Sequence, residues 1–336
     1  MRSDWGRTAA RAVVGAALAL TCSGLVAPSA GASTYNVRQC WGQSGHNNAG
    51  EGRLTKNGTN FAGTDSCASG SDPWAYARPT GGNAYNQSAS WTWTAPAGAY
   101  FNETSVEYGI DIDSGYGGFM SRTTVGGIPL LWEAAATGSK QLSTTDNLES
   151  FGIASYCGAP GGCGSPGSVY SRIRDVRVNV TDTSPPSAPA VGGSIFDPGW
   201  KKGTAETIAT SSSDLGAGLD RLTIEVNGGS ITTLKDMCSP TSTVGWIASL
   251  SPCPTTGGYI NYVSTTSGGF KDGSNTVEVC ASEYGSGAAV RCTTRTVSVD
   301  NNAPSKPTDL AVAQGSEWQQ QDTCLLYTSP SPRDRS

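Results

Sequence analysis

Three acidic side chains in one short stretch are the first candidates for chemistry. In "TSVEYGIDID", residues 104–113, Glu107, Asp111 and Asp113 all occupy odd positions, whereas the even positions from Val106 onward are apolar or aromatic. If the stretch is a β-strand, alternate side chains face opposite sides of the sheet, and the acids share one face. Carboxylates on one face can act as the acid and nucleophile of glycoside hydrolysis, bind calcium or sugar hydroxyls, or simply face solvent.

The spacing resembles part of the E-x-D-x-E pattern of laminarinase-type jelly-roll glycosidases. This chain keeps the central Asp111 but has Gly109 in place of the first Glu and Asp113 in place of the last. The missing first Glu is the nucleophile that the resemblance implies. We therefore expect no catalytic residue here, and we favour a solvated face first and a sugar or calcium contact second.

Trp91 and Trp93 are the other candidates for ligand binding, because they alternate with Thr92 and point the same way on a strand. Such a pair either stacks on sugar rings or lies in the core, and we favour the core because aromatic rings bury a large area. A Ser-His-Asp site is disfavoured, since His46 is the single histidine and no G-x-S-x-G turn occurs. We expect no metal and no cofactor.

The start of the chain predicts export. Arginines precede an apolar run over 12–26, and Ala30-Gly31-Ala32 follows as an A-x-A site. This pattern is typical of a secretory signal peptide over residues 1–32, cleaved after Ala32. The run is shorter than the ~20 residues that span a bilayer, so we expect a secreted protein with no membrane insertion after cleavage. A net charge of −5 and 15% charged residues argue against a nucleic-acid partner.

If the chain is exported, its cysteines are expected to form disulfides, because an even number of cysteines in an exported chain is typical of disulfide bonding. Ten are present, and two of them, Cys22 and Cys324, fall in the predicted signal peptide and in the C-terminal segment 324–336. The simplest pairing joins neighbours along the chain. The predicted disulfides are Cys40 with Cys67, Cys157 with Cys163, Cys238 with Cys253, and Cys280 with Cys292.

The remaining sequence predicts an all-β protein, because short runs rich in β-branched and aromatic residues alternate with Gly, Ser, Asn and Pro clusters. The Pro-rich segments "DTSPPSAP" at 182–189 and "DNNAPSKP" at 300–307 match each other and indicate linkers between modules. We expect two domains, over 33–181 and 190–300, joined by a semi-rigid linker at 182–189.

Residues 190–300 predict about seven short strands, including segments near 205–211, 245–250 and 259–266, as in an immunoglobulin-like sandwich. "LDRLTIEVNGGSITTL" carries an Asn-Gly turn, and Cys280 and Cys292 flank a second hairpin. The segment resembles the bacterial Ig-like repeat. The matching positions are Asp214, Gly216, Gly218, Leu219, Leu222, Val226, Asn227, Gly228, Asp272, Gly273, Val277, Val279 and Ala281.

Residues 33–181 predict eight or nine strands, for which a two-sheet jelly-roll or lectin-like sandwich is the natural architecture. "SASWTWTAPAG" and "SRIRDVRVNVTDTSPPS" resemble parts of poorly characterised domains that precede Ig-like repeats in exported proteins of soil bacteria. The resemblance implies a fold and a cellular setting but no activity.

The end of the chain, residues 301–336, does not continue the two predicted domains. Residues 301–323 read as a linker and the truncated start of a third module. "CLLYTSPSPRD" then resembles the translation of a sequencing adapter, so we expect residues 324–336 to be an artefact.

Together these features favour an extracellular recognition or adhesion protein without catalysis. In this interpretation a β-sandwich that binds polysaccharide or a cell-surface glycan is carried on Ig-like spacers, in association with the cell surface. Two alternatives stay open: a secreted glycoside hydrolase with an accessory Ig-like domain, and a purely structural stalk.

Overall fold

The computed structural model describes residues 31–42, 51–67, 74–113, 115–134, 138–167, 169–203, 205–230, 232–240 and 242–302. The predictions for the signal peptide, His46, most of 301–323 and the segment 324–336 lie outside these residues. The described chain is almost entirely β, as predicted, and it includes the 3-10 turn η2 (Ser194–Phe196). Within the described residues, no helix is both long and apolar enough to cross a membrane.

Twenty strands follow one another along the described chain. They are β1 (Ser33–Gln39), β2 (Arg53–Asn57), β3 (Phe61–Asp65), β4 (Ala75–Pro79), β5 (Ser88–Thr94), β6 (Ala99–Asp111), β7 (Tyr116–Thr124), β8 (Ile128–Ala134), β9 (Gly138–Thr144), β10 (Leu148–Cys157), β11 (Tyr170–Asp182), β12 (Ala190–Gly192), β13 (Glu206–Ser213), β14 (Leu219–Val226), β15 (Thr232–Asp236), β16 (Ser242–Thr243), β17 (Trp246–Ile247), β18 (Thr256–Val263), β19 (Gly273–Glu283) and β20 (Val290–Val299).

Thirteen of these strands form one branched sheet with two limbs. In the first limb β9, β6 and β11 lie side by side, and β11 then pairs with β1 along one part of its length and with β4 along the other. In the second limb the order is β2, β5, β10, β7, β8. A single pair, Leu148 with Phe101, joins the limbs.

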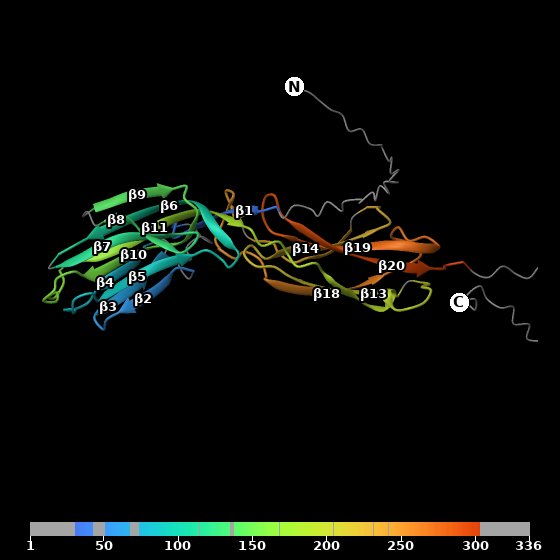
Figure 1. The fold of residues 1–336 in the computed structure, drawn as a ribbon, viewed down its shortest axis with the longest axis horizontal. Helices are drawn as coiled ribbons and strands as arrows, with labels where there is room; N and C mark the ends of the chain where they lie inside the picture. The colour runs from blue at the N-terminus through green and yellow to red at the C-terminus, as the bar shows by residue number, and fades with distance from the viewer. Residues whose placement is uncertain are drawn as a thin grey trace, which may run out of the picture.

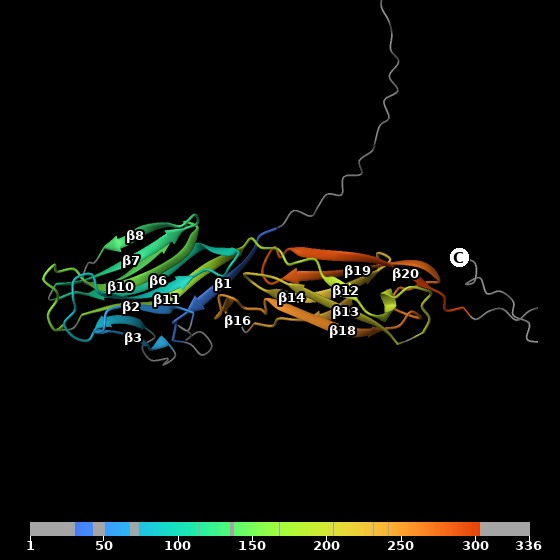
Figure 2. The ribbon, with the colours of Figure 1, turned by 60° about the horizontal axis from the view of Figure 1, so that its bottom comes forward.

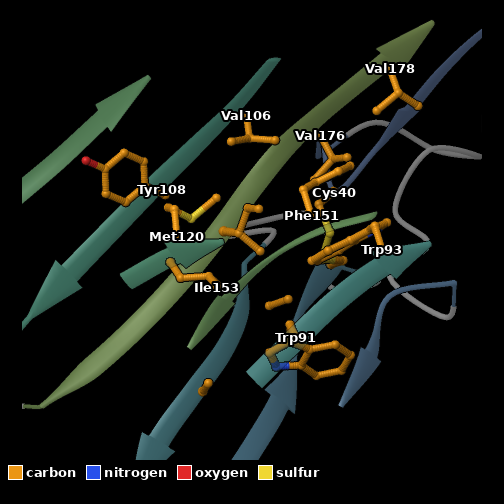
Figure 3. Close-up of a cluster of buried hydrophobic side chains, with 14 of the residues drawn as sticks. Cys40, Trp91, Trp93, Val106, Tyr108, Met120, Phe151, Ile153, Val176 and Val178 are labelled. Atoms are coloured by element: carbon orange, nitrogen blue, oxygen red, sulfur yellow. A yellow bond between two sulfur atoms is a disulfide. The ribbon is translucent and has the colours of Figure 1, made fainter. Parts of the chain in front are cut away.

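Buried side chains from both limbs form one core (Figure 3). Trp93 of β5 and Phe151 of β10 stack with their ring centroids 5.8 Å apart and their planes only 5° from parallel. Val106 and Tyr108 of β6 are fully buried as well. This placement agrees with the predicted alternation over 104–113, in which the even positions face the core.

Strands β12 to β15 and β18 to β20 form two smaller sheets, with orders β12–β13–β18 and β15–β14–β19–β20. A second core fills the space between them and includes Ile208, Leu222 and Val279. The predicted turn joins β14 to β15, and Asn227 and Gly228 both have positive φ (55° and 69°), as a two-residue primed turn requires.

Four disulfides are present in the described residues, and they join neighbours along the chain as predicted: Cys40–Cys67, Cys157–Cys163, Cys238–Cys253 and Cys280–Cys292. Cys280 and Cys292 are also direct cross-strand partners in the β19–β20 hairpin, as predicted.

The two cores lie end to end along an elongated molecule (Figure 1), but more than a linker joins them. The loop closed by Cys238–Cys253 leaves its own sheets, and its strand β17 pairs in parallel with β1 at Ile247 and Val37. Figure 2 shows β16, from the same loop, beside this end of β1. The expected strand over 245–250 is therefore shorter and belongs to the first sheet. Apolar burial explains this placement, because Ile247 and Leu250 are buried in the first core.

Polar contacts reinforce this junction. The hydroxyl of Tyr35 donates a hydrogen bond to the carbonyl oxygen of Leu250 (2.6 Å), and Glu51 accepts from the Leu250 backbone N–H (2.8 Å) and the Ser249 hydroxyl (2.7 Å). Thr34 and Ser286 exchange two backbone hydrogen bonds of 2.9 and 2.8 Å. Buried hydrogen bonds of this kind fix one relative arrangement of the two halves.

Candidate functional site

Two of the three predicted acidic residues lie on one face, which is the outer face of the first limb. Glu107 and Asp111 project from β6 on the side opposite to the core, and both are partly exposed. Glu107 forms an ion pair with Arg174 of β11, with its Oε1 atom 2.6 Å from Nη2. Asp113 is exposed and lies beyond the end of β6. The structure therefore brings Glu107 and Asp111 onto one sheet face, with Asp113 in the turn that follows.

The Glu107 carboxylate is already engaged within the sheet. Its ion pair with Arg174 joins β6 to β11. The E-x-D-x-E pattern also lacks its first Glu in this chain, because Gly109 stands at that position. Glu107 and Asp111 are therefore better suited to contacts than to catalysis.

The two predicted tryptophans lie in the core, which is the alternative favoured for them. Trp91 is 7% exposed and Trp93 is 0% exposed. Each indole N–H is satisfied internally, because Trp91 donates to the backbone oxygen of Tyr76 (2.6 Å) and Trp93 donates to Oε1 of Gln39 (2.8 Å). Figure 3 shows both rings packed inside the sandwich. The ligand-contact role assigned to this pair needs exposed rings, and these rings offer no face to a sugar.

A row of arginine and aromatic side chains covers one end of the outer face. The Arg172 guanidinium lies 4.0 Å from the ring centroid of Trp74 and 4.9 Å from that of Tyr170. Arg174 lies 4.3 Å from the same Trp74 ring. The two guanidinium groups thus cover Trp74, which is only 2% exposed, while Tyr76 and Tyr170 stay half-buried. Stacked guanidinium groups keep their edges available for hydrogen bonds.

Further along the same face lies a groove of about 380 Å³. Its polar lining residues come from β1, β6, β9 and β11 and are Asn36, Glu103, Ser105, Ser143, Arg177 and Asn179. Trp246 lines one side of the groove, although it belongs to β17 in the loop between Cys238 and Cys253. The groove therefore needs both halves of the molecule. Its volume lies within the range of about 300–1,000 Å³ that is usual for small-molecule sites.

Internal contacts hold the groove residues in place. The Asn179 side chain donates to the Asn36 side-chain oxygen (2.7 Å), and the Gln141 side chain donates to the Ser105 hydroxyl (3.2 Å). Amide, hydroxyl, carboxylate and guanidinium groups are therefore presented together beside one indole ring.

A buried ion network underlies one side of the groove. Asp175 lies at an irregularity in β11, with a positive φ of 46°, and binds Arg38 (2.6 Å) and Arg177 (2.5 Å). Burial opposes ionisation of Asp175, but the hydrogen bonds from Arg177 and Arg38 outweigh it and lower the pKa of this carboxyl. The irregularity also returns Arg177 to the outer face, so that both Arg174 and Arg177 face outward.

A second cluster of acidic residues lies at the junction of the two halves and was not predicted. Asp182 ends β11, Asp214 begins the loop after β13, and Glu283 ends β19. The three residues are 0%, 3% and 1% exposed, and one carboxylate oxygen from each lies within 4.8 Å of the others. Within the described residues the other group with possible metal ligands, around Cys280 and Cys292, has its sulfurs in a disulfide.

Burial and mutual repulsion disfavour charge on this cluster. Burial first, and then the negative charges of Asp182 and Glu283, raise the pKa of Asp214 to about 7. Burial also raises the pKa of Asp182, more than the N–H groups of Ala217 and Ser184 lower it. The pKa of Glu283 is raised by burial as well, against a hydrogen bond from the Ala289 N–H.

Some sequence signals pointed to these sites. The odd positions of β6 continue the polar face from Glu107 back to Ser105 and Glu103, and Asn179 follows the arginines on β11. Nothing local in the sequence indicates that Trp246 reaches this face, because the contact depends on how the loop closed by Cys238–Cys253 docks.

Comparisons with known proteins give little help. Neither a protein family nor a curated protein matches the sequence. Among solved structures, the glycoside hydrolase domain of Endo-D from Streptococcus pneumoniae R6 is similar over 74% of this chain, at 10% identity and a TM-score of 0.25. The match spans 37% of that chain. A similarity at this level carries no argument about activity.

Proposed function

We propose that the protein is an extracellular recognition protein that binds a carbohydrate on the outer face of the first limb. The observation that supports this most is the groove beside Asn179, which combines amide, hydroxyl and charged groups with the Trp246 ring. Sugars offer neighbouring hydroxyl groups for such polar partners and an apolar ring face for an indole. Binding sites of this type combine a few placed polar groups with aromatic surface.

The extended shape of the face suits an oligosaccharide or polysaccharide. The positions from Arg172 to Asn179 on β11 span ~23 Å, and the face carries the half-buried Tyr76 and Tyr170 at one end and the groove at the other. Glu107 lies between the two ends in its ion pair with Arg174. In this proposal Glu107, Asp111 and Asp113 border the ligand or face solvent, and none of them is a nucleophile.

The fold supports the same proposal. We propose that residues 33–181 form a jelly-roll or lectin-like sandwich, that residues 190–300 form an Ig-like domain, and that 182–189 connects them. Four disulfides suit an exported protein, in keeping with a signal peptide over 1–32. The second domain has two roles in this proposal, since it acts as a spacer and also contributes Trp246 to the groove.

The test is a binding assay of the full chain on a glycan array and on insoluble polysaccharides, with Asn179→Ala and Glu103→Gln as variants. Glu103 is exposed and Asn179 has only one side-chain hydrogen bond to protein, so we expect both variants to fold. We expect each to weaken binding at least about tenfold, because a polar group placed for a ligand contributes ~1.4 kcal/mol or more. Matched controls are Asn57→Ala on β2 and Asp236→Asn on β15, which are exposed and do not line the groove.

The same samples distinguish the alternatives. Bound polysaccharide without released reducing sugar supports recognition. Release of reducing sugar that disappears in Asp111→Ala would instead show a glycoside hydrolase. Absence of binding to any glycan, with wild type and variants alike, would leave the structural stalk and contradict the proposal.

A further inference from the structure

We propose that Asp182, Asp214 and Glu283 bind one calcium ion that joins the two halves of the molecule. The three carboxylates come from three separate elements, namely the end of β11, the loop after β13 and the end of β19. They are all buried, and their nearest oxygen atoms lie within 4.8 Å of one another. The inference does not depend on carbohydrate binding.

Poorly satisfied polar atoms in the cluster point to a bound cation. Both carboxylate oxygens of Asp214 and the Oε2 atom of Glu283 are buried without a hydrogen bond of good geometry. The backbone N–H groups of Leu215 and Gly218 lie near Asp214, and the Ser33 hydroxyl lies near Glu283, but these contacts are weak. Because a buried charge without a strong partner is costly, one cation would satisfy the three oxygens together.

A fourth oxygen comes from a different kind of residue. Ser33 is 0% exposed, its hydroxyl has no hydrogen bond of good geometry, and it pairs directly with Asp182 across β1 and β11. Its hydroxyl also lies beside Glu283, close enough to affect that carboxyl group. Ser33 therefore adds a neutral oxygen to the acidic cluster, which is the mixture of oxygen ligands that calcium takes.

Glycines make room for the cluster. Gly216 has a positive φ of 68°, and a Cβ atom at this position would lie 2.3 Å from Oδ2 of Asp182. Gly285 has a φ of 122°, and a Cβ atom there would lie 3.2 Å from the Ser33 hydroxyl oxygen. Glycine at these two positions therefore lets the backbone come close to Asp182 and to Ser33.

The ligand set favours calcium over magnesium. Calcium takes about 6–8 oxygen ligands in a flexible geometry, whereas magnesium needs near-ideal octahedral geometry and keeps several of its water ligands. Three buried carboxylates and a hydroxyl from separate elements suit the ion that accepts the more flexible geometry.

The test uses the full chain, freed of metal with EDTA and then titrated with calcium chloride near neutral pH. We expect one calcium ion per chain by calorimetry. At a calcium concentration about a hundred times Kd, we expect Tm to rise by about 5–10 °C for a protein of this size. Magnesium chloride at the same concentration should produce a clearly smaller shift. Equal Tm values in EDTA and in calcium would overturn the proposal and leave a cluster that shares protons.

Asp214→Asn is the informative variant, because Asn keeps the size of the side chain and one oxygen that can face the N–H groups of Leu215 and Gly218. We expect it to lose calcium binding at least about tenfold while its metal-free Tm is equal to or above that of the wild type. Calcium binding at wild-type strength in Asp214→Asn would contradict the proposal.

Two further variants keep the test decisive. Glu283→Gln retains the oxygen that accepts a hydrogen bond from the Ala289 N–H. We expect this variant to show the same loss of calcium binding. It therefore tests the calcium site even if Asp214→Asn does not fold. Asp236→Asn, an exposed acid of the same half, is the control and should bind calcium like the wild type. A loss in this control would show that bulk charge, rather than this cluster, holds the ion.

Discussion

The stability of the metal-free protein should depend on pH because of Asp214. The perturbation is a change of pH from 5 to 8 in EDTA, applied to the wild type and to Asp214→Asn. Asp182, Glu283, Tyr35 and Arg291 are the titratable or charged groups that interact with the cluster. Removal of the Asp214 carboxyl removes the group whose pKa is raised to about 7.

The structure sets the size of the effect. The pKa of Asp214 rises from its ordinary value of 3.8 to about 7 in the folded protein. Each unit of this difference corresponds to about 1.4 kcal/mol in the free energy of unfolding. Over the whole range from below pH 4 to above pH 7 this amounts to about 4 kcal/mol, of which about 2.6 kcal/mol falls between pH 5 and pH 8. The three carboxyls share their protons, so we expect about 2–3 kcal/mol in total over that window.

The sign follows from the direction of the shift. Folding favours the protonated form of Asp214, so its contribution is fully present below about pH 4 and is lost as the pH rises through about 7. Asp175 has the opposite sign, because its pKa is lowered, and its contribution is lost only in acid. Between pH 5 and 8 the cluster of Asp182, Asp214 and Glu283 therefore dominates the pH dependence of stability. The metal-free protein becomes less stable as the pH rises.

The assay is thermal unfolding in EDTA, followed by the fluorescence of buried tryptophans such as Trp93. We expect the Tm of the wild type to fall by on the order of 10 °C between pH 5 and pH 8. In Asp214→Asn the fall should be at most half as large. Equal Tm values at the two pH values in the wild type, or the same fall in the variant, would refute this reasoning.

Three other outcomes follow from the structure. Trp93→Ala should lower the free energy of unfolding by about 3–5 kcal/mol in denaturant titration, because it empties a buried site, whereas Trp200→Ala, at 50% exposure, should change it by less than about 0.5 kcal/mol. Joint replacement of Cys238 and Cys253 by Ser should cost about 3 kcal/mol and increase hydrogen exchange in β1, which pairs with the loop that they close. Glu107→Gln should cost less than about 1 kcal/mol, because its ion pair is about one third exposed.

The sequence predicted those parts of the structure that depend on local patterns. The alternation from Val106 to Ile110 placed apolar side chains in the core and Glu107 outside. The turn at Asn227 and Gly228 followed from the need for positive φ. Neighbouring cysteines pair because the hairpins and loops that carry them bring them close.

The sites could not be predicted to the same extent, because they depend on docking between distant segments. The groove needs Trp246 beside Asn179, and the sequence contains no signal for the parallel pairing of β17 with β1. The junction cluster joins Asp182, Asp214 and Glu283. Asp214 and Gly216 are visible as part of the Ig-like pattern, but their approach to Asp182 depends on the arrangement of the two halves.

The most direct test of carbohydrate recognition is a structure of the full chain with the oligosaccharide that binds best on a glycan array. The proposal predicts that the sugar occupies the groove between Asn179 and Trp246, with hydrogen bonds to the polar side chains of β6 and β11. A sugar bound at another surface, or an array on which no glycan binds, would contradict it.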